Sequence, residues 1–570
     1  MKKKIKKSGI NNSLTNYGDV EFSSYLRRSF AKSMGYTNES LNKPIVGIIN
    51  TSSGFNSCHR HFPEMIDALK RGINSNGCLP IEFPVISLGE VYLHPTSMMF
   101  RNLMSMDVEE MIRAQPVDAV VLLGGCDKTL PAMIMGAISA EKPFVVLPAG
   151  PMITSKFEND RLGACTDCRK YWSKFREGKI SLNKISEVEN KLASSAGTCS
   201  VMGTASTMAC ISEAMGLCLT DSSCAPAVYS ERLKIAEKTG IVSAKIAGKK
   251  IKKIKKINKQ DIYNALVCLL SLGGSTNAII HLTAIAGRLG IKIDLRELNK
   301  ISNKTPVLVD LKPTGKFYME DFYHAGGMKV LLKELKPLLK LGTNNIEGKS
   351  LSTIINGNSK CFHDQNVIRS RKKPFEKYGG LISLFGNICP NGAILKRSAA
   401  DKKLFEKTGK AIVFEDIKTM SKLIDNQSLK ISKNDFLILK NIGPKTIYGM
   451  PEAGYLPIPK KLLKSGVKDM IRISDGRMSG TAFGTIILHV SPESSIGGPF
   501  AVIKNGDKIK LSVKNKRLDL MISKNELRNR LDNQTNKKVP NIKRGYLKLY
   551  YDSVLQAHEG CDFDFLQYKK

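Results

Sequence analysis

The chain has 570 residues, 13 cysteines and a formal net charge of +37, and no apolar run approaches the roughly 18 residues of a membrane span. The cysteines are scattered and the N-terminal lysines precede no apolar segment, which excludes a disulfide scaffold and a signal peptide. We therefore expect a soluble, cytoplasmic protein without a membrane partner, long enough for at least two domains.

Four apolar runs in the first third of the chain predict β-strands. They cover residues 44–50, 79–86, 119–123 and 143–147, with helical patterns between them. Strands that alternate with amphipathic helices are typical of a parallel sheet covered by helices. The sequence therefore predicts an α/β fold for this part of the chain.

A lysine-rich run at residues 248–257 is the strongest candidate for a nucleic-acid contact. Lysine is, however, spread over the whole chain, and no nucleic-acid-binding motif accompanies the charge. We interpret the charge as a compositional bias and expect no specific nucleic-acid partner. The run is predicted to be a solvated connection before a helix that Asp261 caps, with Ile251, Ile254 and Ile257 touching the body.

The sequence changes character after about Lys373. Short β-like runs, separated by Gly, Pro and Asn, stand at residues 411–415, 435–439, 470–473 and 500–502. This pattern predicts a second, β-rich domain. We place the domains at residues 1–373 and 374–570.

The most informative motif follows the third predicted strand. Residues 124–133 read Gly-Gly-Cys-Asp-Lys-Thr-Leu-Pro-Ala-Met. Two glycines after a buried strand predict a tight turn, and ligands bind at the carboxyl ends of strands in open α/β sheets. Cys126, Asp127 and Lys128 are therefore expected in a crevice, although such a tripeptide alone also suits a helix cap.

This decapeptide resembles the first signature of the dehydratase family that contains dihydroxy-acid dehydratase, phosphogluconate dehydratase and the aldonic-acid dehydratases. A second signature, Ile-Arg-Ile-Ser-Asp-Gly-Arg-Met-Ser-Gly-Thr, stands at residues 471–481. The resemblance implies an N-terminal α/β/α domain and a C-terminal barrel-like domain that swivels, with the active site between them. Further family-like blocks lie in the family's order at residues 87–90, 197–205, 273–277, 449–452, 488–493 and 497–499.

The resemblance implies a [2Fe–2S] cluster held by Cys58, Cys126 and Cys199. Their spacing is no motif by itself, so this assignment depends on the resemblance. Three protein thiolates would leave one iron with an open position, where it acts as a Lewis acid. Cys165 and Cys168 have the spacing of a zinc or redox pair, but no second pair accompanies them, so we expect free thiols near the mouth of the active site.

The resemblance also implies a magnesium ion. Glu90, Asp127 and Glu452 occupy family positions whose oxygens bind this hard cation. Lys128 matches a lysine that is carbamylated in some relatives, which would turn its amine into an anionic oxygen donor. An unmodified Lys128 could instead pair with Asp127.

Ser479 matches the serine that is proposed in the family to remove the proton at carbon 2 of the substrate. Serine beside glycine is ordinarily a turn residue, and its hydroxyl is too weakly acidic in water to act as a base. The role therefore requires nearby positive charge that lowers the pKa of the hydroxyl. Loss of water from a 2,3-dihydroxy acid would then give a 2-keto-3-deoxy acid without nicotinamide or flavin.

The substrate is predicted from two segments, residues 94–103 and 555–566, which look more like the sugar-acid branch of the family. We expect a pentonate such as L-arabonate or D-xylonate. The alternatives are 2,3-dihydroxyisovalerate, on the route to valine and isoleucine, and a cluster-containing RNA-binding sensor, which would have no need of Ser479. The family also implies a homodimer or homotetramer. The residues predicted to bind substrate are His94, Arg101, Thr481 and His558.

Overall fold

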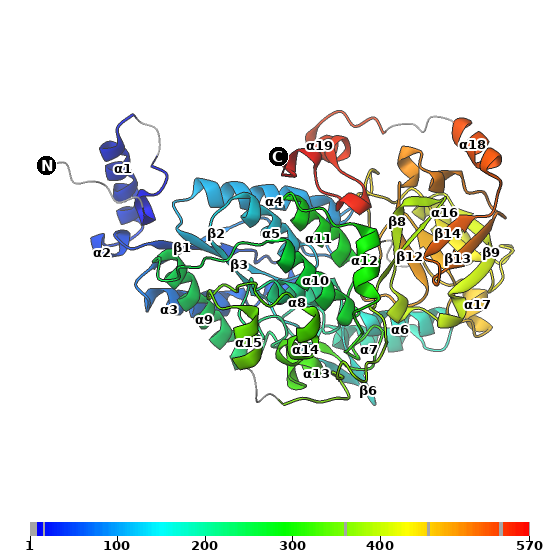
Figure 1. The fold of residues 1–570 in the computed structure, drawn as a ribbon, viewed down its shortest axis with the longest axis horizontal. Helices are drawn as coiled ribbons and strands as arrows, with labels where there is room; N and C mark the ends of the chain where they lie inside the picture. Colours follow the sequence, from blue (N-terminus) through cyan, green and yellow to red (C-terminus); the bar gives the residue numbers. More distant parts are fainter. Residues whose placement is uncertain (1–7, 15–17, 358–361, 453–455, 535–539, 569–570) are drawn as a thin grey trace.

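The computed structural model describes residues 8–14, 18–357, 362–452, 456–534 and 540–568. Its N-terminal part is built on a four-stranded parallel sheet with the strand order β2-β1-β3-β4 (Figure 1). All four strands predicted from the first third of the sequence are confirmed. Their bounds are Ile45–Asn50 for β1, Leu79–Pro84 for β2, Ala119–Gly124 for β3 and Phe144–Pro148 for β4.

Helices cover both faces of this sheet, because alternate side chains of its strands enter two separate cores. Val46 and Ile48 of β1 join the core with α3 (Phe62–Asn74) and α9 (Ser230–Ala247). Ile45 and Ile49 face the opposite core. The predicted α/β/α layering is confirmed. The second core is covered by α4 (Ser97–Ala114), α5 (Thr129–Ser139), α8 (Thr204–Ala214), α10 (Lys259–Ser271) and α11 (Asn277–Gly287).

The C-terminal part forms a closed eight-stranded barrel with the order β10-β11-β12-β8-β7-β14-β13-β9. The predicted barrel-like domain is confirmed, with one correction. Residues 500–502 are not a strand but part of a 3₁₀ turn, Pro499–Val502, because Pro499 lacks an N–H and stands at the start of the turn. The strands are β7 (Ile382–Gly386), β8 (Cys389–Leu395), β9 (Glu406–Phe414), β10 (Phe436–Leu439), β11 (Arg472–Ser474), β12 (Ile486–Ser491), β13 (Lys508–Ser512) and β14 (Arg517–Leu520).

The lysine-rich connection before α10 differs from the prediction in two details. Asn258, not Asp261, caps the helix, because the Asn258 side chain accepts from two backbone N–H groups while Asp261 closes the capping box. Ile254 is exposed, whereas Ile251 and Ile257 pack against the body as predicted.

The remaining elements lie around these two parts. Among the residues that the structure describes, no helix is long and apolar enough to cross a membrane. The elements are α1 (Val20–Ser33), α2 (Asn38–Leu41), β5 (Ser155–Phe157), β6 (Asp160–Leu162), α6 (Thr166–Arg176), α7 (Leu182–Leu192), α12 (Leu295–Ser302), α13 (Met319–His324), α14 (Gly327–Leu335), α15 (Leu351–Gly357), α16 (Ile417–Leu423), α17 (Lys460–Lys464), α18 (Lys524–Asp532) and α19 (Gly545–Ser553).

The C-terminal segment returns from the barrel to the N-terminal part and lies beside α4 and α11 (Figure 1). A fully buried ion pair, 2.6 Å between Arg288 Nε and Asp562 Oδ2, fixes it there. The two parts are therefore joined by more than the connection between α15 and β7, in which the predicted boundary at residues 373/374 falls. That boundary stays a prediction.

Candidate functional site

The turn after β3 presents three adjacent reactive side chains at the carboxyl end of the sheet. Gly125 has no room for a side chain, because a Cβ atom would meet the Cβ of Ala149 at 2.6 Å. Cys126 then adopts a left-handed backbone conformation with φ 57°, and α5 begins three residues later at Thr129. Gly125 and this left-handed residue together make the tight turn predicted from the sequence.

His59 links the turn after β3 to the segment after β1 that carries Cys58. Its Nε2 accepts the N–H of Gly125 at 2.9 Å, and its Nδ1 donates to the carbonyl of Thr51 at 2.8 Å. Burial lowers the pKa of His59 to about 4, so the ring is neutral and can accept at one nitrogen while it donates at the other. Since Cys58 precedes His59, the histidine fixes the turns that carry Cys58 and Cys126. Sequence reasoning missed this residue.

Glu90, Asp127 and Glu452, here called the acidic triad, converge on one point. One oxygen of each lies within 4.8 Å of the others. The Nζ atom of Lys128 lies 2.9 Å from Glu90 Oε2, 3.4 Å from Glu452 Oε1 and 3.5 Å from Asp127 Oδ2. The structure thus brings together the four residues that were predicted around magnesium.

The charges within this group balance one another. Burial opposes ionisation of Glu452, but Lys128 and Arg477 overcome it and hold the pKa of this carboxyl at about 2. Burial raises the pKa of Asp127 to about 6, against the attraction of Lys128. Burial and Arg477 lower the pKa of Lys128, yet the three carboxylates together raise it above its ordinary value. Three oxygen donors that need positive charge beside them are suited to a hard divalent cation.

The thiols of Cys58, Cys126 and Cys199 form a second group beside the triad. The Cys126 thiol and burial raise the pKa of Cys58 well above its usual range. At Cys199 the Cys165 thiol acts in the opposite direction, but burial, Cys58 and Asp127 together raise the pKa. Thiols that oppose one another's ionisation in this way fit a cationic iron centre, which stabilises thiolates.

Cys165 lies closer to this group than the sequence suggested. Its Sγ atom is 3.4 Å from Cys199 Sγ, and the thiol of Cys168 donates to its carbonyl at 2.7 Å. The pair had been expected only near the mouth of the site. The contact with Cys199 could not be foreseen, because nothing in the spacing relates these two segments.

Ser479 belongs to a loop of the barrel that reaches the N-terminal part. The amide of Asn277 donates to the carbonyl of Met478 at 3.1 Å. Gly480 passes so close to Ser275 that a Cβ atom would meet the serine oxygen at 2.6 Å. The blocks at residues 273–277 and 471–481, far apart in sequence, therefore meet at this loop.

The Ser479 hydroxyl ends a chain of hydrogen bonds. Arg169 Nε donates to Thr481 Oγ1 at 3.4 Å, and Thr481 Oγ1 lies 2.8 Å from Ser479 Oγ. The N–H of Thr481 also donates to Ser479 Oγ at 3.4 Å. Donors aimed at this oxygen favour its ionised form. Arg169 also helps to lower the pKa of Glu452, so it connects the Ser479 loop with the acidic triad.

Arg477 is a further site residue to which sequence reasoning assigned no role. Its fully buried guanidinium lies 2.6 Å from Glu452 and 3.4 Å from Glu90, and it donates to Thr96 Oγ1 at 2.8 Å. It therefore ties the barrel loop to carboxylates of the triad. Its position two residues before Ser479 in the second signature was the available signal.

Replacing Arg477 with methionine is expected to destabilise the protein by roughly 3–5 kcal/mol, because Glu90 and Glu452 lose a buried cation. Chemical denaturation of the variant measures this loss. Arg71→Met is the matched control, since the 3.0 Å pair of Arg71 with Glu237 is exposed to solvent, and it should cost about 1 kcal/mol or less. Equal losses in the two variants would contradict this role of Arg477.

Among the described residues, neither His94 nor Arg101 forms a hydrogen bond or ion pair with the acidic triad or with Ser479. His94 is exposed. Arg101 is fully buried, and its guanidinium donates to His281 and to the carbonyls of Gly560 and Cys561, which favours a role in holding the C-terminal segment. Their predicted contacts with substrate stay predictions. Only Thr481 of this set lies beside Ser479.

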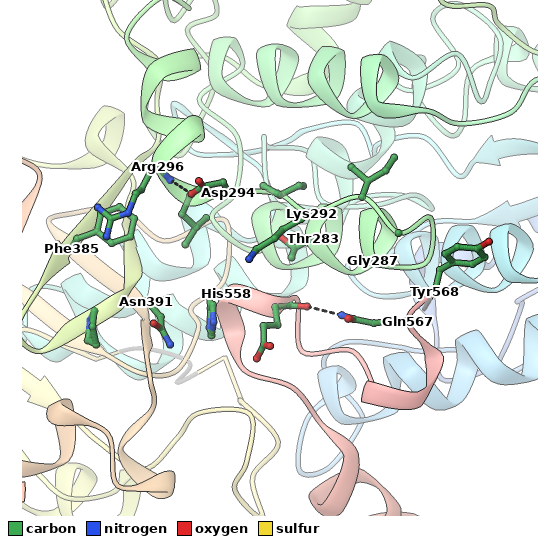
Figure 2. A pocket seen from close by; sticks show the side chains of 16 residues that line it. Thr283, Gly287, Lys292, Asp294, Arg296, Phe385, Asn391, His558, Gln567 and Tyr568 are labelled. Carbon is green, nitrogen blue, oxygen red and sulfur yellow. Dashed lines mark hydrogen bonds between the residues drawn. The ribbon is translucent and has the colours of Figure 1, made fainter. Parts of the chain in front are cut away.

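His558 lines a separate pocket of about 610 Å³. Figure 2 shows it there with Asn391 of the barrel and Lys292 of the segment between α11 and α12. Its Nδ1 lies 2.8 Å from Ser491 Oγ. Among the described residues that line this pocket, none belongs to the acidic triad or the Ser479 loop, so the substrate role of His558 also stays a prediction.

Comparisons with known proteins cover nearly the whole chain. Residues 43–354 match the N-terminal model of the dihydroxy-acid/6-phosphogluconate dehydratases, and residues 366–561 match the C-terminal model. The chain is 43% identical to an L-arabonate dehydratase of Azospirillum brasilense over 96% of each chain. It is 41% identical to a 6-deoxy-6-sulfo-D-gluconate dehydratase of Pseudomonas putida over 93% of this chain and 91% of the relative. A dihydroxy-acid dehydratase of Caldicellulosiruptor saccharolyticus is 34% identical over 94% of this chain and 97% of the relative.

Proposed function

The chain belongs to the dihydroxy-acid/6-phosphogluconate dehydratase family, and we propose that it is a cytoplasmic hydro-lyase that converts a sugar acid into a 2-keto-3-deoxy acid. The first-choice substrate is a pentonate such as L-arabonate or D-xylonate. The observation that carries the proposal is the convergence of the acidic triad around Lys128, on the same turn as the Cys126 thiol.

Two inorganic cofactors fit the donors at this site. The oxygens of the acidic triad would hold Mg²⁺, and Cys58, Cys126 and Cys199 would hold a [2Fe–2S] cluster. When bound, they supply Lewis acidity for the charge that develops on the substrate and for the hydroxide that leaves it. Lys128 is the candidate for carbamylation, and a mass increase of the intact chain that is lost on acidification would identify the modification.

The protein's own groups account for the proton at carbon 2. In the proposed reaction the Ser479 oxygen takes this proton from a 2,3-dihydroxy acid. Thr481 donates to this oxygen through its N–H, and its hydroxyl is oriented by Arg169, so both can stabilise the developing alkoxide. Arg477 keeps Glu90 and Glu452 in place beside this loop. The enol that forms when water leaves carbon 3 then tautomerises to the keto acid.

The substrate class is supported by the names of the relatives. Those at 43% and 41% identity act on L-arabonate and a sulfogluconate, whereas the dihydroxy-acid dehydratase is 34% identical. The last relative still covers most of the chain and keeps 2,3-dihydroxyisovalerate as the second candidate substrate. We also propose a homodimer or homotetramer, as the family implies.

A substrate panel tests the proposal. Anaerobically purified protein is expected to convert L-arabonate or D-xylonate at least about a hundredfold more efficiently, in kcat/KM, than 2,3-dihydroxyisovalerate. A site that binds the hydroxyl groups of a sugar acid keeps unpaired polar groups when the substrate carries methyl groups instead. Such a site can discriminate between the two substrates in kcat/KM by much more than this factor. Keto-acid formation is followed for each substrate. Equal or better turnover of 2,3-dihydroxyisovalerate would contradict the sugar-acid assignment and favour a role in branched-chain amino-acid synthesis.

A further inference from the structure

Lys396 is a buried lysine whose amine has no partner. It follows β8 directly and is 7% exposed, and its Nζ atom has no hydrogen-bond partner among the residues that the structure describes. Lysine is almost never buried unless it is paired. Lys440, which is similarly buried, follows this rule and donates to Glu415 and to two backbone carbonyls. The arrangement at Lys396 is therefore costly and calls for a functional explanation.

Lys396 and Ser479 line the same small cavity. Its volume is about 20 Å³, which is room for about one water molecule. Thr276 and the apolar side chains of Met478, Ile486 and Leu488 contribute to the rest of the lining. Among the residues that line this cavity, Lys396 carries the only ionisable side chain.

Burial alone lowers the pKa of Lys396 to about 7. The neighbouring charges are engaged elsewhere: Arg397 donates to the carbonyl of Gly379, and Arg472 pairs with Asp469 at 3.0 Å. Around neutral pH a large fraction of Lys396 is therefore an uncharged amine. An uncharged amine can accept a proton.

We propose that Lys396 is a positioning residue for Ser479 that accepts the hydroxyl proton of Ser479 through a water molecule in the shared cavity. This inference rests on the proposed function. Lys396 would provide the proton acceptor that the direct contacts of Ser479 lack. Thr481 donates to the serine oxygen through its N–H. Among the described residues, the only group within hydrogen-bonding distance that could accept the serine proton is the Thr481 hydroxyl.

The proton transfers balance over one turnover. The O–H bond of Ser479 breaks, the water takes its proton and passes one of its own to the Lys396 amine, and the serine oxygen keeps the electron pair. Ser479 becomes a hydroxyl again when it takes the carbon-2 proton of the substrate. The proton on Lys396 then returns through solvent to the hydroxide that leaves carbon 3, and the net product is water.

Lys396→Met tests this role, because methionine has a similar shape and no proton acceptor. We expect kcat for L-arabonate to fall about a hundredfold or more, within the range for proton transfer by a positioned group. The wild-type kcat should fall below pH 7, where Lys396 is charged, and this limb should be absent from the remaining activity of the variant. Lys440→Met is the matched control and should keep both kcat and the pH profile.

Thermal unfolding separates this role from a structural one. The pKa of Lys396 is lower in the folded state than in the unfolded chain. Between about pH 10 and pH 7 the unfolded chain therefore binds a proton that the folded chain does not. The stability of the wild type consequently falls as the pH falls through this range. Lys396→Met should therefore melt at a higher temperature than wild type at pH 6, with a smaller difference at pH 9.5. Lys440→Met should melt at a lower temperature, since it loses a paired amine.

Each outcome decides the inference. Lower stability together with lost turnover in Lys396→Met would assign the lysine a structural role and contradict the proposal. Unchanged kcat and pH profile would contradict it while leaving the dehydratase function intact. Absence of turnover in the wild type would overturn the proposed function and this inference with it.

Discussion

Replacing Ser479 with alanine is expected to lower kcat for L-arabonate by at least about a thousandfold, while the fold and the iron content stay as in the wild type. The substitution removes the oxygen that we propose takes the carbon-2 proton, and proton transfer of this kind contributes about 10²–10⁴-fold. It touches no residue of the acidic triad and none of the three thiols. Steady-state turnover, iron analysis and circular dichroism of the variant measure the three quantities.

Two further variants sharpen this result. Ser495→Ala removes another hydroxyl of the C-terminal part, one that donates to Glu493, and should keep wild-type turnover. Thr481→Val should lower kcat by a smaller factor, because it removes the hydroxyl that lies 2.8 Å from the Ser479 oxygen but leaves the N–H of residue 481. Appreciable turnover by Ser479→Ala would move the base elsewhere, with Thr481 or Lys128 as the next candidates.

Replacing Cys126 with serine is expected to remove the brown colour, the bound iron and all turnover. Serine fits the site in size, but its hydroxyl is a poor substitute for a thiolate ligand of iron. With the wild type, colour and activity should be lost together on exposure to air, because a cluster with three protein thiolates leaves an iron open to oxidants. Visible absorption and iron analysis of anaerobically purified protein provide the measurement.

Other cysteines serve as controls for this substitution. Cys389→Ala, in the barrel, should retain iron and colour, since that thiol lies among apolar barrel residues. Cys165→Ser is the more stringent control because its sulfur lies 3.4 Å from Cys199 Sγ. Loss of iron from Cys165→Ser would make Cys165 a fourth ligand, and retention of iron by Cys126→Ser would contradict the cluster assignment.

The parallel sheet could be predicted because its central strands are buried on both faces. A strand such as Ala119–Gly124 is apolar throughout, and the glycines after it indicate a turn. The run at residues 500–502 is similarly apolar but begins behind Pro499, and there the proline sets a 3₁₀ turn instead of a strand. Apolar composition therefore predicted the buried elements better than it predicted their type.

In the candidate site, residues marked by a local sequence pattern could be predicted, whereas residues that act through distant contacts could not. Position at the end of β3 drew attention to Cys126, Asp127 and Lys128, and the resemblance to a dehydratase signature then favoured a site over a helix cap. Arg477 and Glu90, which are in contact, are separated by 387 positions in the sequence, and no local pattern predicts their contact. The unpaired amine of Lys396 is also invisible in the sequence, since a lysine after a strand is ordinarily exposed.

Dehydration of a sugar acid at the Cys126–Lys128 turn and the Ser479 loop can be observed in deuterated water. Anaerobically purified wild type is incubated with L-arabonate and with D-xylonate, and the products are identified by NMR. We expect a 2-keto-3-deoxy acid that carries solvent deuterium at carbon 3, because the enol takes its new hydrogen from water. Protein that contains its full iron and yet forms no keto acid from either pentonate or any other aldonate would contradict the proposed function.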